Sequence, residues 1–189
     1  MQASAPMIRG EMEYEFSDQE GGQFLATGKV VAFLRSYLAK GEIDQAVELY
    51  ESCVENVGDA LFLEFKVASK TVQKAMANLF YRARDYRRAA AACEIIGEWG
   101  AAARAYEAAL QWPKAAECHL RVGAKDRAAA MLQKAGDHRR AAELYFEAGD
   151  LASAASVLAG ASDFLGAARL SLRAGDKKRA AQELAQVPP

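Results

Sequence analysis

Cys118 and His119 are neighbours in the sequence, and a cysteine beside a histidine suggests a nucleophile or half of a metal site. In a helix, however, adjacent side chains point about 100° apart, so the two cannot face one ligand. The other histidine, His138, follows an aspartate at a turn and is expected to be exposed. No phosphate-binding glycine loop, HExxH or GxSxG motif occurs. We therefore predict that the chain is not an enzyme and has no catalytic, metal or cofactor site.

The three cysteines, Cys53, Cys93 and Cys118, show no CxxC spacing and are odd in number. This argues against a set of disulfides and favours a reducing compartment. The sequence starts without a signal peptide, and no stretch approaches the roughly 18 apolar residues of a membrane span. We therefore expect a cytoplasmic protein that does not insert into a membrane.

A 13-residue repeat governs the second half of the chain. From Arg87 onward the sequence can be cut into consecutive 13-residue units without a gap; there are eight units, and the last is one residue short. The third and fourth positions are alanine in all eight units, from Ala89–Ala90 to Ala180–Ala181. Such a short internal period is typical of repeat proteins built from stacked elements.

Glycine and aspartate mark the end of many units. Glycine adopts the left-handed conformation that ends a helix, and aspartate caps the next helix by accepting a hydrogen bond from a free backbone N–H. Each unit is therefore predicted to be one helix of about ten residues. Glycine fills the eleventh position in five units and aspartate the twelfth in four: Gly97, Gly123, Gly136, Gly149 and Gly175, and Asp137, Asp150, Asp163 and Asp176.

The apolar positions of the unit fall on one face of such a helix. Positions 3, 4, 6, 7 and 10 lie within an arc of roughly 160°. His119 occupies position 7, which Tyr106, Leu132 and Tyr145 fill in other units, so we expect its side chain in the core. Short connections make successive helices antiparallel. The predicted fold class is all-α, an α-solenoid of short antiparallel helical hairpins, in which each helix is one 13-residue unit and each hairpin is a 26-residue pair of units.

The first half of the chain is less regular. Residues 1–22 are polar and acidic and are predicted to be mobile. Helical patterns begin near Ala26, and a first helix ends at Gly41. Residues 59–84 predict two longer, more apolar helices. We therefore divide the chain into a mobile segment 1–22, irregular helices 23–86 and regular repeats 87–189, the last two forming one continuous solenoid.

The pattern Tyr-x-x-Ala-Gly-Asp-x-x-x-Ala-Ala, from Tyr145 to Ala155, resembles the helical hairpins of the tetratricopeptide-like superfamily. In style it is similar to the repeats of soluble NSF attachment proteins, clathrin heavy chain and intraflagellar-transport solenoids. The resemblance covers residues 27–187 and implies a solenoid that binds other proteins. The 34-residue unit and its Trp-Leu-Gly-Tyr signature are missing, so no specific partner and no binding residue is carried over.

Charge is unevenly distributed, with a net −7 in residues 1–60 and +6 in residues 61–189. Basic residues fill position 2 in five units. In an antiparallel stack alternate helices line one side, so the first, third and fifth units are predicted to form a basic ridge for an acidic partner. A solvated face is the alternative. Nucleic acid is not expected, because no aromatic residues interleave with the ridge. The predicted contact residues are Arg87, Arg88, Lys114, Arg139 and Arg140.

Aromatic residues share the thirteenth position, at the turn: Trp99, Trp112 and Phe164. We expect them to fill the gap between successive hairpins, and anchors for a partner are the alternative.

Two functions remain open on the sequence alone. The first is an interaction scaffold or adaptor that presents a solenoid surface to a protein or peptide. The second is a helical regulatory or docking region of a larger protein whose enzymatic or ligand-sensing domain lies outside this chain. The partner, the binding face and the oligomeric state do not follow from the sequence.

Overall fold

The computed structural model describes residues 21–53 and 57–188, with side chains described from residue 27 onward. Within these residues the regular structure is α-helix, in twelve helices, and no strand occurs among them. This confirms the all-α class. Of the predicted mobile segment, residues 1–20 lie outside the described part, whereas Gly21 and Gly22 already belong to helix α2 (Gly21–Lys40). That helix therefore begins earlier than the expected start near Ala26.

The chain divides between Ala92 and Cys93 into two compact units, each described here by itself. The first holds α2 and three further helices, α3 (Ile43–Ser52), α4 (Val57–Phe65) and α5 (Lys70–Arg82), and the boundary falls within α6 (Tyr86–Ile96). Helices α4 and α5 stand where the sequence predicts two longer helices between residues 59 and 84; α5 has 13 residues, whereas α4 has nine and is shorter than predicted.

Large side chains fill the core of the first unit. Leu34, Leu61, Phe65 and Phe80 are fully buried. The ring of Phe80 meets that of Tyr50 edge-on, with centroids 5.7 Å apart. Burying side chains of this size contributes roughly 1.5–3 kcal/mol each, which lets helices of unequal length and spacing pack stably.

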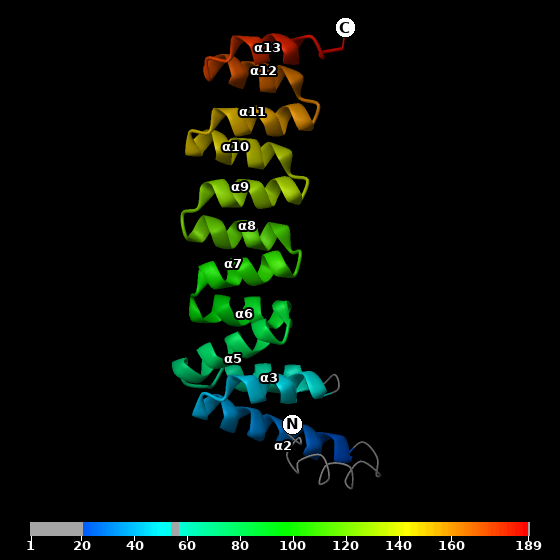
Figure 1. Ribbon diagram of the computed structural model, residues 1–189, viewed down its shortest axis with the longest axis vertical. Coiled ribbons are helices and arrows are strands. Elements are labelled where there is room, and N and C mark those ends of the chain that lie inside the picture. The colour runs from blue at the N-terminus through cyan, green and yellow to red at the C-terminus, as the bar shows by residue number, and fades with distance from the viewer. Residues whose placement is uncertain (1–20, 54–56, 189) are drawn as a thin grey trace, which may run out of the picture. The chain divides into compact units, whose positions relative to one another are not determined.

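Seven short helices follow one another in the second unit, each packed on the next, with turns on alternate sides (Figure 1). Their first residues are spaced by thirteen, as predicted, and this unit is an α-solenoid. The helices are α7 (Trp99–Ala108), α8 (Trp112–Arg121), α9 (Lys125–Lys134), α10 (His138–Ala148), α11 (Leu151–Gly160), α12 (Phe164–Arg173) and α13 (Lys177–Leu184).

The paired alanines form the contacts between these helices. All of them are buried except Ala181, on α13. Side chains this small let neighbouring helix axes approach closely. A helix of about ten residues is marginal alone in water, so its stability comes from these neighbours.

The turns follow one backbone pattern whatever residue occupies them. The five glycines at position 11 have φ between 76° and 86°. Where glycine is absent, Leu110 (φ 57°) and Ser162 (φ 65°) adopt the same left-handed conformation. Arg84 (φ 59°) lies one full repeat unit before Gly97 and does so too. The regular turn geometry therefore starts one unit earlier than the predicted start at Arg87.

The predicted aspartate caps are confirmed. Each aspartate accepts a hydrogen bond from the backbone N–H three residues later, with O···N distances of 2.9–3.2 Å. Such a cap is typically worth about 1 kcal/mol. The four pairs are Asp137–Arg140, Asp150–Ser153, Asp163–Gly166 and Asp176–Arg179. No helix among the described residues is long and apolar enough to cross a membrane.

Candidate interaction site

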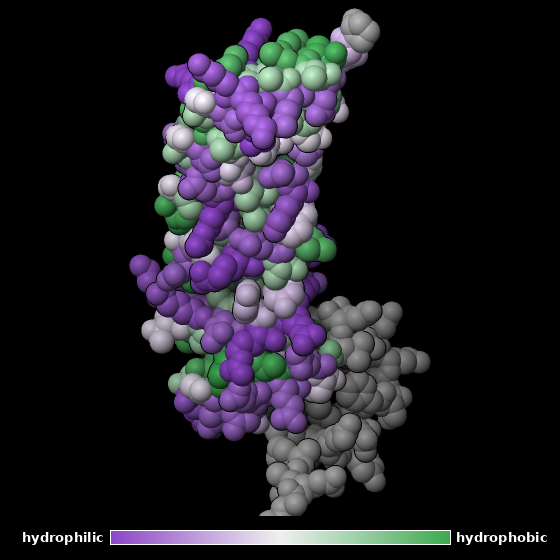
Figure 2. Space-filling model, turned by 45° about the horizontal axis from the view of Figure 1, so that its top comes forward, coloured by the Kyte–Doolittle hydropathy of each residue, from purple (hydrophilic) through white to green (hydrophobic). Residues whose placement is uncertain are grey.

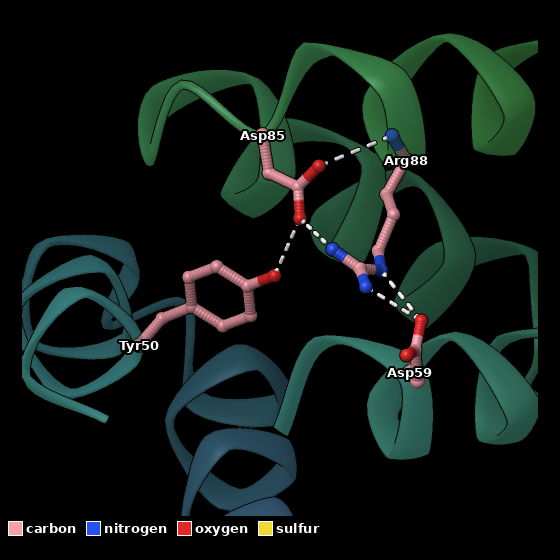
Figure 3. Close-up of polar contacts among 4 residues, drawn as sticks. All are labelled: Tyr50, Asp59, Asp85 and Arg88. Carbon is pink, nitrogen blue, oxygen red and sulfur yellow. Dashed lines mark hydrogen bonds and ion pairs between the residues drawn. The ribbon is translucent and has the colours of Figure 1, made fainter. Parts of the chain in front are cut away.

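Arg88, one of the predicted contact residues, is held by carboxylates of the first unit (Figure 3). Its guanidinium forms ion pairs with Asp59 of α4 and with Asp85, the residue before α6. Asp85 also accepts a hydrogen bond from the Tyr50 hydroxyl, with an O···O distance of 2.7 Å. Burial raises the pKa of Tyr50 above its ordinary value, and the bond to Asp85 adds to the shift. The charge of Arg88 is thus largely compensated inside the fold.

Glycine makes room for this cluster. A Cβ at Gly58 would lie 2.6 Å from the Tyr50 hydroxyl oxygen and 2.8 Å from Cζ of Arg88. The guanidinium therefore packs directly against the backbone of α4. Replacing Gly58 would separate the arginine from its partners, which marks the cluster as a structural contact between helices.

The other predicted contact residues, Arg87, Lys114, Arg139 and Arg140, are exposed. Lys114 lies over the ring of Tyr106, with Nζ 5.3 Å from the centroid. Arg139 pairs with Glu143 on its own helix, with an N···O distance of 3.3 Å. On the face shown in Figure 2, polar side chains predominate and apolar ones form small separate patches.

A recurrent contact links position 13 of one unit to position 9 of the second unit after it. Arg121 lies 4.4 Å from the Trp99 ring centroid and Lys134 lies 4.8 Å from that of Trp112. In the next pair of this series, Lys125 at position 13 forms an ion pair with Glu147 at position 9, with an N···O distance of 2.8 Å. Each tryptophan is half-buried and contacts the next helix of the stack. The three pairs, each with the same separation in sequence, are Trp99–Arg121, Trp112–Lys134 and Lys125–Glu147.

The next pair in this series is incomplete. His138 is at position 13, and the equivalent position 9 is Gly160, which has no side chain to offer. The Nδ1 atom of His138 is buried and has no hydrogen-bond partner among the described residues. The expectation that His138 is exposed is wrong: its side chain is half-buried at the start of α10.

A second gap in the pattern lies close by, on α12. Position 2 carries Lys114 on α8 and Arg140 on α10, but Gly166 on α12. A Cβ at Gly166 would meet the Asp163 carboxylate at 2.5 Å and a methyl carbon of Leu158 at 2.9 Å. A side chain here would therefore require Asp163 and Leu158 to shift.

A groove opens beside Gly166. It lies between α10 and α12, with α11 contributing to its floor, and has a volume of about 840 Å³. This volume is within the range of pockets that hold drug-sized ligands, roughly 300–1,000 Å³. We call it the α10–α12 groove; its lining residues are His138, Arg139, Ala142, Glu143, Phe146, Glu147, Leu158, Ala161, Asp163, Gly166, Arg169 and Leu170.

Arg139 is the one predicted contact residue that lines the groove. Phe146 and Arg169 also line it but were not among those predicted, because position 2 was given most weight. The signal that could have found them is Gly166, which stands where α8 and α10 carry Lys114 and Arg140.

Cys118 and His119 have separate partners, as the helical geometry requires. His119 Nε2 lies 2.6 Å from a carboxylate oxygen of Glu107, and the Cys118 thiol is 3.7 Å from Glu94. Burial, reinforced by Glu94, raises the pKa of Cys118 to about 11, so little thiolate forms at neutral pH. No cluster of three or more potential metal ligands occurs among the described residues.

Neither the models of protein families nor the sequences of curated proteins yield a match to this chain. A hypothesis about its function therefore rests on the geometry of the chain itself.

Proposed function

We propose that this chain is a non-catalytic binding protein and that the α10–α12 groove receives a peptide segment of a partner protein. The observation that carries the proposal is the groove itself, which has a volume of about 840 Å³ and is lined by Gly166 where α8 and α10 carry a basic residue.

The exposure of apolar surface in the groove supports this role. Phe146 is 37% exposed, and Leu158 and Leu170 lie half-buried along the same groove. Exposed aromatic side chains beside a concave surface are frequent anchors in protein interfaces. The resemblance to tetratricopeptide-like solenoids, which bind proteins, points in the same direction. Three free cysteines favour a reducing, cytoplasmic setting.

The test is a random peptide library displayed against the full chain and against a variant with the groove filled. Gly166→Arg restores the basic residue that α10 carries at Arg140, where the same aspartate cap is formed. We expect peptides that the unaltered chain enriches and the variant does not. Circular dichroism and a thermal melt establish that the variant is folded.

A second variant, Ala161→Trp, fills the groove from α11 at an exposed position. Because it fills the groove from a different residue, it shows whether a loss of peptide binding in Gly166→Arg comes from the filled groove or from local damage at Gly166. Arg127→Gln, an exposed arginine of α9 outside the groove, is the control and should enrich the same peptides as the unaltered chain. The proposal is wrong if the filled and unfilled proteins select the same peptides.

A further inference from the structure

Helix α13 is the last helix that the structure describes, and its outer face differs from that of the helices before it. Position 4 of the repeat is buried in α7 to α12, where another helix follows, and position 7 is buried or half-buried there. On α13 the same two positions, Ala181 and Leu184, are exposed, Leu184 to 47%. Figure 2 shows hydrophobic side chains gathered at this end of the stack. Helix α13 therefore presents to solvent the face that its predecessors bury.

The sequence after α13 lacks the turn that would bring the next helix onto this face. In the seven turns before it, the residue at position 11 has positive φ, and the backbone N–H at position 12 donates to the carbonyl at position 7, with N···O distances of 2.8–2.9 Å. In the last unit position 11 is Pro188, whose ring fixes φ near −65°, and position 12 is Pro189, which has no N–H. The chain therefore cannot cover α13 through the turn used throughout the repeat. The seven residues at position 11 are Gly97, Leu110, Gly123, Gly136, Gly149, Ser162 and Gly175.

The uncovered face of α13 is apolar. At 100° per residue, Ala181, Leu184 and Ala185 fall within an arc of roughly 100°, with Lys178 at its edge, and all four are exposed. The terminal helices of repeat proteins ordinarily carry a polar outer face, which keeps the end of the stack soluble. Helix α13 has the residues of an internal helix instead, so its outer face is suited to packing against another helix.

A second copy of the chain offers a surface that fits this face. Among the described residues, the alanine pairs of the other repeat helices are buried, so α13 is where a second copy has this packing surface free. Ala181 and Leu184 are three residues apart on one face. In an antiparallel, two-fold symmetric pair of α13 helices, Leu184 of each copy would lie against Ala181 of the other. Lys178 would then lie near the C-terminal end of the other helix, where the helix dipole favours a cation.

We propose that two copies of this chain associate through the outer faces of their α13 helices, in this antiparallel arrangement. One face of an eight-residue helix is smaller than the standard interface of about 800 Å² per partner. The dimer is therefore weak, with a dissociation constant of roughly 10–100 µM. The α10–α12 groove has no lining residue from α13, so the proposal does not depend on peptide binding there.

Sedimentation equilibrium of the full chain, at concentrations below and above this dissociation constant, measures the self-association. Leu184→Glu and Ala181→Glu each place a charge from both copies in the apolar contact, and we expect each to weaken the dimer at least about tenfold. Gln182→Glu is the matched control, because it adds the same charge to α13 at an exposed position about 100° away from Ala181, and we expect no change. Circular dichroism and a thermal melt establish that all three variants are folded.

Disulfide cross-linking tests the antiparallel arrangement. Cys53→Ser is included in each protein, because Cys53 is half-buried whereas Cys93 and Cys118 are buried. One protein carries Ala181→Cys and the other Leu184→Cys, and the two are mixed and oxidised with copper phenanthroline. We expect the mixed disulfide between the two proteins to form faster than either symmetric one, as mass spectrometry of the products will show.

Three outcomes would overturn the proposal. The unaltered chain stays monomeric at the highest concentration, both glutamate variants self-associate as strongly as the unaltered chain, or the symmetric disulfides form as fast as the mixed one. The first two would exclude α13 as the interface, and the third would exclude its antiparallel pairing. Leu184→Glu should select the same library peptides as the unaltered chain, so failure of the dimer and failure of the proposed function remain distinguishable.

Discussion

Glycine has two opposite roles in the second unit. Gly149 ends α10 with φ at 85°, a conformation that costs an ordinary residue roughly 1–2 kcal/mol. Gly160 is the last residue of α11; its φ is not positive, and a Cβ there would meet nothing within 4 Å. The first glycine is required by the backbone, whereas the second is not.

The same substitution at the two sites should therefore have effects of opposite sign. Gly149→Ala is expected to lower the free energy of unfolding by about 1 kcal/mol, because alanine is strained at positive φ. Gly160→Ala is expected to raise it by up to about 0.5–1 kcal/mol, since alanine restricts the unfolded chain. Urea denaturation of the two variants measures both, and shifts in the same direction would contradict the assigned roles.

The cap of α11 depends on an ionised carboxylate. Hydrogen bonds from Ser153 hold the pKa of Asp150 below its ordinary value of 3.8. A lowered pKa in the folded state means that the stabilisation is complete above the ordinary value and is lost as the pH falls through the folded one.

Asp150→Ala is accordingly expected to cost about 1 kcal/mol at pH 7. Its cost relative to the unaltered chain should shrink as the pH falls below 3.8, where the unaltered carboxylate becomes protonated. Chemical denaturation of both proteins at neutral and acidic pH measures this difference. A cost that stays constant with pH would assign the effect to the loss of side-chain contacts.

At the scale of the helix, the paired alanines set how closely neighbours approach. Ala141 on α10 and Ala154 on α11 are completely buried. Leucine at either place would need volume inside a packed helix–helix contact, because the alanine it replaces has no exposed surface. The helix–helix contact is thus intolerant of added volume.

We expect Ala141→Leu or Ala154→Leu to destabilise the chain by roughly 1–3 kcal/mol. Arg127→Leu, which adds leucine to an exposed position of α9, should change stability by less than about 0.5 kcal/mol. Denaturant titration compares the two classes. Equal effects would mean that the alanine face is not the packing face.

The helices of the second unit were predictable because most of them carry a local start or stop signal. Aspartate caps and left-handed glycines act within a few residues, so local sequence determines them. The turn at Leu110 was harder to predict from the sequence, since leucine rarely adopts positive φ. Only the register of the repeat predicts it, which means that the neighbouring turns impose the conformation. The early start of α2 carries no such local signal.

For the molecule as a whole, compensation of charge was the hardest property to predict. Arg88 and Arg140 occupy equivalent positions in the repeat. Arg88 is paired with Asp59, a residue of the irregular half, while Arg140 stays exposed and pairs with Asp137 at 3.8 Å. An ion-pair partner such as Asp59, which does not belong to the 13-residue repeat, cannot be predicted from the periodicity. The groove was predictable in principle, because Gly166 stands where α8 and α10 carry a basic residue, but its volume depends on the packing of α10, α11 and α12 together.

Because successive helices of the second unit alternate in direction, even-numbered and odd-numbered helices present different sides of the stack. The walls of the groove belong to α10 and α12, so it opens on the side that even-numbered helices share. Removal of one repeat unit upstream, residues 111–123 with α8, would leave every alanine contact available yet transfer the groove to the opposite side of the stack relative to α7. Removal of two units, residues 111–136 with α8 and α9, would keep it on the same side. Changes in repeat number during evolution or engineering would therefore preserve the orientation of this surface only when they come in pairs.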